Sequence, residues 1–213
     1  MKEYIKIETV YERDINGTKK LIEGKFRDET VEYLKNNFWD WTEKIDGTNI
    51  GVIWDGHKVS FQGRTEKAQI PATLVNRLNE LFGGEETEEL FEQTFGEKNV
   101  ILFGEGFGKK IQKNGWLYIP DGVDFILFDV YLPDQDLWLK RDAVESIAVR
   151  FGISVVPIVF RGDIDDAVRF VKSEPISTIG VAPMEGIVGR PMVEIRNREG
   201  KRVIVKVKVR DFE

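Results

Sequence analysis

Short runs rich in Val, Ile, Phe and Trp recur along the chain between polar segments, a pattern typical of β-strands. Two of these runs flank Asp55-Gly56, a common hairpin turn, so they are expected to pair antiparallel. Strands are predicted near residues 38–43, 49–55, 57–63, 99–105, 123–131, 154–160, 185–190 and 202–210.

Other segments repeat apolar residues every three or four positions, which is the spacing of a helix with one buried face. They lie between the predicted strands rather than in one block. This order and the antiparallel hairpin favour an α+β fold over the parallel sheet of many nucleotide-binding proteins. Helices are predicted near residues 28–36, 71–82, 86–95, 139–150 and 163–172.

Length and composition indicate an ordinary globular protein. Of the 213 residues, 41% are hydrophobic and 32% charged, enough for one sizeable core. No repeat or linker marks a boundary, so a single domain over residues 1–213 is expected. Because neither a membrane span nor a signal peptide is visible, we expect a cytoplasmic protein. The absence of cysteine excludes disulfides, thiolate metal sites and cysteine nucleophiles.

The net charge of −6 argues against nucleic-acid binding unless basic residues cluster. Acidic residues concentrate over residues 85–97, in a predicted solvated helix. A basic face on an acidic chain therefore stays open. The clustered basic residues are Lys109, Lys110 and Lys113, and then Lys201, Arg202, Lys206, Lys208 and Arg210.

The segment TEKIDGTNI, residues 42–50, carries an apolar strand into a polar turn that contains Lys44 and Asn49. A glycine among polar residues at a strand end suits a tight turn that faces a ligand. A plain surface turn between two strands would have the same composition.

The segment ILFGEGFGKK, residues 101–110, superficially resembles a glycine-rich phosphate loop. It lacks the spacing of such loops, and Glu105 would repel a phosphate. A carboxylate here is better suited to accept a hydrogen bond from a ribose hydroxyl or to orient a metal-bound water. The alternative is a glycine-rich strand exit with no ligand.

Two further strands contain candidate ligand residues. In VDFILFDVYL, residues 123–132, most apolar side chains are expected in the core, but Phe128 offers a ring on which a purine base can stack. In RVIVKVKVR, residues 202–210, strict alternation places Lys206 and Lys208 on the face opposite the valines. The two lysines either form a phosphate clamp or protect an edge strand.

Taken with MEGIV at residues 184–188, these segments in this order resemble the ATP-dependent RNA ligases of the T4 RNA ligase 2-like group. That group belongs to the covalent nucleotidyltransferase superfamily, which also contains DNA ligases and capping enzymes. The resemblance spans Lys44 to Lys208 and implies an antiparallel-sheet nucleotidyltransferase domain over residues 1–213. It also leads us to expect no C-terminal accessory or OB domain.

The resemblance implies a role for each motif residue. EKIDGTN is similar to the nucleophile motif of the family, FGEGFG to its ribose-binding strand, FDV to its adenine-stacking segment, and MEGIV and KVK to its metal-side and phosphate-binding segments. Lys44, Lys206, Lys208 and Glu185 are the implied catalytic residues, with Glu185 also the metal ligand. The implied nucleotide-binding residues are Glu43, Lys44, Asn49, Arg64, Glu105, Phe128, Glu185, Lys206 and Lys208.

The resemblance further implies ATP and Mg²⁺ (or Mn²⁺) as cofactors. A lysyl-AMP intermediate would form and pass AMP to an RNA 5′-phosphate, which a 3′-hydroxyl then attacks. A lysine with an unperturbed pKa is only about one part in a thousand neutral near pH 7.4, so nearby cations are expected to lower the pKa of the nucleophile. The expected partners are RNA ends, in nicked duplex or single strands, and no membrane.

Several alternatives stay open. Asn49 and the short chain favour an RNA ligase over a small ATP-dependent DNA ligase or a capping enzyme, which usually have arginine at this place. A nucleotide- or RNA-binding module that kept the fold without catalysis is the alternative from another class. His57, the single histidine, lies beside the predicted hairpin turn and is expected at the surface, which excludes chemistry that depends on histidine clusters.

Overall fold

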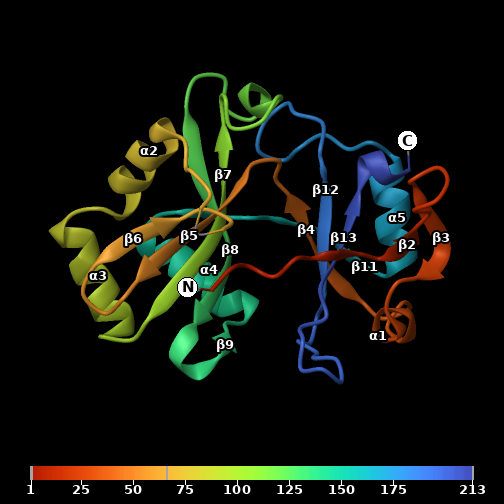
Figure 1. Ribbon diagram of the computed structural model, residues 1–213, viewed down its shortest axis with the longest axis horizontal. Coiled ribbons are helices and arrows are strands. Elements are labelled where there is room, and N and C mark those ends of the chain that lie inside the picture. Colours follow the sequence, from red (N-terminus) through yellow and green to blue (C-terminus); the bar gives the residue numbers. More distant parts are fainter. Residues whose placement is uncertain (1, 66, 213) are drawn as a thin grey trace. The chain divides into compact units, whose positions relative to one another are not determined.

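The computed structural model describes residues 2–65 and 67–212. The chain forms two compact units (Figure 1). Unit 1 consists of Met1–Ile5 and Asp46–Val156, and unit 2 of Lys6–Ile45 and Pro157–Glu213. The chain therefore leaves unit 2 directly after Ile45 and returns to it at Pro157. That the two act as a single nucleotidyltransferase domain stays a prediction.

Unit 1 is built on a sheet with the strand order β10-β8-β7-β5-β6, in which β9 also pairs with β8. All pairs are antiparallel except β10 with β8. The predicted hairpin joins β5 to β6, and the Asp55 carboxylate accepts hydrogen bonds from the backbone of the turn. The strands are β5 (Thr48–Trp54), β6 (Val59–Gln62), β7 (Val100–Gly108), β8 (Val123–Leu132), β9 (Leu137–Trp138) and β10 (Ser154–Val155).

Three helices cover one face of this sheet: α2 (Ala72–Phe82), α3 (Glu85–Phe95) and α4 (Arg141–Phe151). Their apolar faces join alternate residues of β5 and β7 in one core that includes Ile50, Val52 and Leu102. The residues between these, such as Ile53 and Phe103, point to the opposite face. We call that face of unit 1 the Glu105 face.

Unit 2 has a second sheet, in the order β1-β13-β12-β4-β11. Only β1 pairs parallel to its neighbour within this sheet. A small antiparallel pair, β2 with β3, lies apart from it. The strands are β1 (Glu8–Thr9), β2 (Tyr11–Arg13), β3 (Leu21–Phe26), β4 (Trp39–Lys44), β11 (Ile158–Gly162), β12 (Gly186–Pro191) and β13 (Val205–Lys208).

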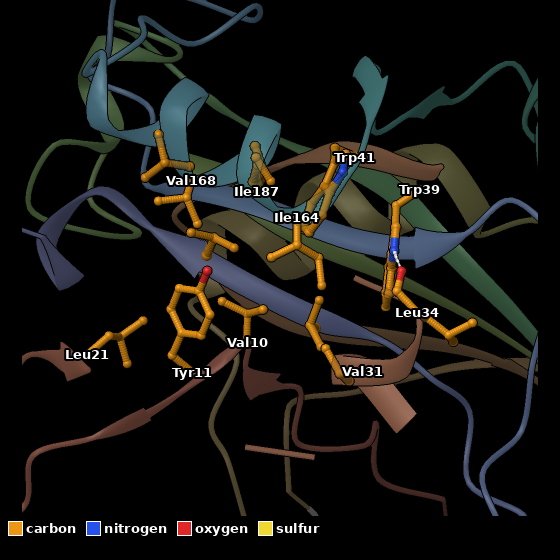
Figure 2. Packing of buried hydrophobic residues seen from close by; sticks show 14 of the residues in the cluster. Val10, Tyr11, Leu21, Val31, Leu34, Trp39, Trp41, Ile164, Val168 and Ile187 are labelled. Atoms are coloured by element: carbon orange, nitrogen blue, oxygen red, sulfur yellow. Dashed lines mark hydrogen bonds between the residues drawn. The ribbon is translucent and has the colours of Figure 1, made fainter. Parts of the chain in front are cut away.

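The core of unit 2 lies between this sheet and two helices, α1 (Glu29–Tyr33) and α5 (Ile164–Lys172). Figure 2 shows Trp39 and Trp41 packed with Ile164 and Ile187, and the Trp39 indole donates to the backbone oxygen of Leu34. Odd-numbered residues of β4 and β13, namely Trp39, Trp41, Val205 and Val207, fill this core. The even-numbered ones, Lys44 among them, therefore lie on the opposite face, which we call the Lys44 face.

The α+β fold with antiparallel sheets confirms the fold class predicted from sequence, and the predicted helices all form. Two predicted strands differ. The strand expected over 154–160 is two strands in two sheets, because Pro157 has no N–H to continue the ladder. The strand expected over 202–210 is regular only over Val205–Lys208 and ends in a 3₁₀ turn, Val209–Asp211. Among the described residues, no helix is long and apolar enough to cross a membrane.

Candidate active site

Lys44 is the last residue of β4, and the sheet places Glu185 and Lys208 beside it. Gly186, the first residue of β12, is the register partner of both Lys44 and Lys208. The strands approach so closely that a Cβ on Gly186 would lie 2.2 Å from the backbone oxygen of Val207. Glycine at this position therefore lets β12 bring the preceding Glu185 between the two lysines.

The Glu185 carboxylate binds both lysines. One oxygen lies 2.7 Å from the Lys44 Nζ, and the other accepts a hydrogen bond from the Lys208 Nζ. Burial raises the pKa of the Glu185 carboxyl, but the two ammonium groups outweigh burial and hold the pKa below its usual value. Glu185 is therefore ionised at neutral pH and neutralises part of the charge on this face.

Lys206 shares the Lys44 face with Lys44 and Lys208, as the alternation predicted. Its side chain is half-buried and lies in the field of the other two lysines. Burial, with the charges of Lys208 and Lys44, lowers the pKa of Lys206 to about 8, although Glu8 and Glu185 oppose this effect. Three lysines around one carboxylate leave a net positive site suited to phosphate groups.

Glu43 precedes Lys44 but points to the other face of β4, where only 2% of the residue is exposed. Its carboxylate accepts hydrogen bonds from the Ser177 hydroxyl and from the backbone N–H and hydroxyl of Thr178. That Glu43 also contacts a nucleotide stays a prediction, although these three hydrogen bonds already occupy its carboxylate. The residue fixes the segment after α5 against the strand that carries Lys44, a role that the sequence did not indicate.

On unit 1, the Glu105 face presents two of the predicted nucleotide-binding residues side by side. Asn49 of β5 and Glu105 of β7 are register partners, and both are partly exposed. Glu105 lies inside β7, which runs three residues beyond it, and not at the strand end expected from sequence. A carboxylate and an amide next to each other offer an acceptor and a donor to one polar ligand.

Phe128 is the extra residue where the register of β7 and β8 shifts, between the partners Phe103–Asp129 and Gly104–Leu127. It packs at the edge of the Tyr4 ring, with 4.9 Å between centroids, and joins the cluster on the Glu105 face. Tyr4 also donates a hydrogen bond to the buried Asp129. The N-terminal segment thus supports the predicted stacking residue from one side, which no local signal in the sequence indicated.

Arg64 follows β6 in an exposed loop of unit 1, two residues past Gln62. His57 is exposed beside the hairpin turn, as expected. The second basic cluster is partly neutralised, because Lys201 pairs with Glu199 and Arg202 with Glu194. The first cluster, by contrast, is exposed along the loop between β7 and β8.

The donor set for a metal is small. Among the described residues, no group of three or more His, Cys, Asp or Glu side chains could hold a metal ion. Glu185 supplies one carboxylate on the Lys44 face. This fits Mg²⁺, which commonly keeps several waters and binds through one or two carboxylates and the phosphates of a substrate.

Antiparallel sheets with interleaved helices, and a lysine at a strand end beside a carboxylate and two further lysines, are the features expected of a nucleotidyltransferase. The chain belongs to the RNA ligase family, which matches residues 38–208. No curated protein matches the chain in a sequence comparison.

Solved structures of Naegleria gruberi RNA ligase share the fold. A variant with ATP and manganese superposes with a TM-score of 0.65 at 20% identity, over 95% of this chain and 60% of that one. The enzyme with pyrophosphate gives 0.64 at 21% identity, over 98% and 62%. A second variant with ATP and manganese gives 0.66 at 20%, over 94% and 55%. The chain thus spans less than two thirds of the length of the proteins it matches.

Proposed function

We propose that this protein is an ATP-dependent RNA ligase that forms a covalent adenylate on Lys44. The observation that carries the proposal is the cluster on the Lys44 face, in which Glu185 binds Lys44 and Lys208 while Lys206 stands next to them. A surface turn alone does not explain three lysines around one partly buried carboxylate. The family membership and the shared fold support the same conclusion.

In the first step, the Lys44 Nζ attacks the α-phosphorus of ATP. A bond forms between this nitrogen and phosphorus, the bond to the bridging oxygen breaks, and pyrophosphate leaves with the electron pair. The Lys44 Nζ can attack only as a neutral amine, and in this structure it is bound to the Glu185 carboxylate. Separation of this pair is therefore part of the activation of Lys44.

Lys206 and Lys208 are the proposed phosphate ligands. Their charges act on the charge that develops as pyrophosphate leaves, within a site fixed by the β12–β13 ladder. A bound Mg²⁺ would supply further stabilisation of phosphate charge, with Glu185 as its protein ligand.

The proposed nucleoside ligands lie on unit 1. Glu105 accepts from a ribose hydroxyl, Asn49 lies beside it, and Phe128 stacks on adenine. Arg64 contacts the nucleotide and the substrate end. Glu43 acts as a positioning residue for β4 rather than through contact with ATP.

The later steps concern RNA. AMP passes from Lys44 to the oxygen of an RNA 5′-phosphate, and a 3′-hydroxyl then attacks that phosphate and releases AMP. Partners are RNA ends in nicked duplex or single strands. The experiments must distinguish an RNA ligase from a DNA ligase and from a binding module without catalysis.

Incubation with ATP labelled at the α-phosphate tests the first step. Wild type should gain the mass of one AMP, whereas Lys44→Ala should gain none at an almost unchanged melting temperature, because a partly exposed strand-end lysine contributes little to the core. Adenylation of Lys44→Ala would remove the assignment of the nucleophile. Incubation of the adenylated protein with 5′-phosphorylated RNA and matched DNA then separates RNA ligase, DNA ligase and a protein that stops at adenylation.

A further inference from the structure

The loop between β7 and β8, residues 109–122, carries the first basic cluster, and we call it the 109–122 loop. Lys109, Lys110 and Lys113 are exposed along it. Lys109 pairs with Asp121 at 2.7 Å, which leaves Lys110 and Lys113 to set the charge of the loop. On a chain of net charge −6, this is a local positive region.

Backbone contacts within the loop restrict its conformation. Its ends are joined by a hydrogen bond of 2.8 Å from the Lys109 N–H to the Gly122 oxygen. A 3₁₀ turn, Gly115–Leu117, packs so tightly that a Cβ on Gly115 would lie 1.8 Å from the Gly108 oxygen. Lys110 has φ of 66°, a left-handed conformation that is strained for a lysine and that often occurs at functional sites.

The loop is also bonded to the turn that follows the nucleophile. The Gln112 side chain donates to the Gly47 oxygen at 2.8 Å, and the Tyr118 hydroxyl accepts from the Asp46 N–H at 3.3 Å. Asp46 is two residues after Lys44 in the chain, a separation of at most about 7 Å between Cα atoms. The loop is thus tied to backbone close to the reacting lysine.

A large aromatic side chain projects from this loop. All five tryptophans lie within the described residues; Trp39, Trp41, Trp54 and Trp138 are buried, whereas Trp116 is 54% exposed. An exposed indole three residues after Lys113 in a basic loop has the composition of a platform on which a nucleic-acid base stacks while the neighbouring phosphates bind the ammonium groups. Neither the core nor the ATP chemistry of Lys44 uses this side chain.

We propose that the 109–122 loop binds the RNA strand, with a base stacked on Trp116 and the flanking phosphates bound by Lys110 and Lys113. RNA as the polymer rests on the proposed function. Because every base has an aromatic face, the contact should hold a single-stranded nucleotide without preference for sequence. The rigid loop gives up little conformational freedom when the base binds.

Direct binding tests this without any catalytic step. Titration of a short single-stranded RNA should quench the tryptophan fluorescence of wild type, and bound RNA should shield Trp116 from iodide. Trp116→Leu should weaken the Kd by about 5- to 150-fold, the range expected for one stacked base. An oligomer of the same length without bases should bind wild type and Trp116→Leu equally. Tyr33→Leu, which changes a more exposed aromatic residue of unit 2, is the matched control and should leave the Kd unchanged.

The roles of Lys110 and Lys113 are tested separately, through the salt dependence of RNA binding. Lys110→Ala and Lys113→Ala should each reduce the slope of log affinity against log salt by about one, whereas Lys20→Ala, an exposed lysine of unit 2, should not. Trp116→Leu should keep that slope. These results would assign phosphate contacts to the lysines and base contact to the indole.

An unchanged Kd in Trp116→Leu, or full access of iodide to tryptophan in the saturated RNA complex, would overturn the proposal. If Trp116→Leu folds poorly, the proposal is tested instead by the iodide measurement on wild type and by the affinity of the variant Trp116→Phe for RNA. Self-adenylation is measured on the same preparations. Wild type that binds RNA through Trp116 but gains no AMP would refute the ligase proposal alone, and normal adenylation with no role for Trp116 would refute the loop proposal alone.

Discussion

At the scale of single residues, Glu43 and Lys44 are adjacent in the sequence but lie on opposite faces of β4 and have different roles. Lys44 points to the face where phosphates are proposed to bind, whereas Glu43 is buried on the other face and holds Ser177 and Thr178. A strand makes this division because successive side chains alternate between its two faces. The buried carboxylate therefore stabilises the segment after α5 and leaves the lysine free to change partner.

Loss of the Glu43 carboxylate should be costly. Glu43→Ala leaves three donors on Ser177 and Thr178 without their acceptor, and we expect the free energy of unfolding to fall by about 2–4 kcal/mol. Urea denaturation measures this. Glu199→Ala, which removes an exposed ion pair with Lys201, is the control and should leave stability almost unchanged. Equal effects in both variants would show that the buried network contributes nothing.

Phe128 should determine the choice of base. Phe128→Leu removes the stacking ring, and the KM for ATP in self-adenylation should rise by about 5- to 150-fold, with less discrimination against GTP and CTP. Phe38→Leu changes an exposed ring of unit 2 and should behave as wild type. An unchanged preference among the three nucleotides in Phe128→Leu would exclude Phe128 from the base site.

At the scale of elements, β13 explains how a half-buried lysine is tolerated. Val205 and Val207 anchor the strand in the core of unit 2, and this holds Lys206 on the other face next to Lys208 and Lys44. The ladder to β12 fixes the spacing of the charges. The strand therefore holds Lys206 where its positive charge is unfavourable, and a bound phosphate can reduce this electrostatic cost.

That cost predicts a pH dependence of stability. The pKa of Lys206 is about 8 in the folded chain, below its ordinary value of 10.5, because of burial and of Lys208 and Lys44. Between these values the unfolded state binds more protons, so the free energy of unfolding should rise with pH from about 8 to 10.5. The melting temperature of wild type minus that of Lys206→Met should increase over this window. A constant difference would mean that Lys206 titrates normally.

At the scale of the whole molecule, the net charge of −6 opposes a general attraction to RNA phosphates. Several lysines and arginines are engaged in ion pairs, such as Lys172 with Glu23 and Arg161 with Asp40. RNA contacts therefore depend on a small number of sites, which include the 109–122 loop. Binding that depends on few phosphate contacts is weak at physiological ionic strength.

The two halves of the reaction should differ in their response to salt. RNA sealing should fall between about 50 and 200 mM salt, by about threefold for each phosphate contact because each contact releases counterions, whereas self-adenylation with saturating ATP should change far less. Both are measured on one preparation over the same range. Equal sensitivity of the two steps would show that RNA binding is not the limiting contact.

The sequence by itself determined the elements and the order of the motifs. Periodicity located all five helices and most strands, because alternation and helical spacing are local consequences of one buried face. It also placed Lys206 and Lys208 on one face, since two residues along a strand return to the same side. The strands β1 to β3 were not predicted, because β1 and β2 are very short and β3 is mostly exposed, so that its residues do not alternate between apolar and polar.

Only the tertiary structure decided which groups meet. Glu185 lies 141 residues from Lys44 in the chain, and no local spacing indicates that one carboxylate binds Lys44 and Lys208 together. The same holds for Glu43 with Ser177, and for Gln112 with Gly47. These contacts join distant segments, and strand register and packing select them from many pairings of similar local energy. The local pattern fixes the face on which a side chain lies, and the fold chooses its partner.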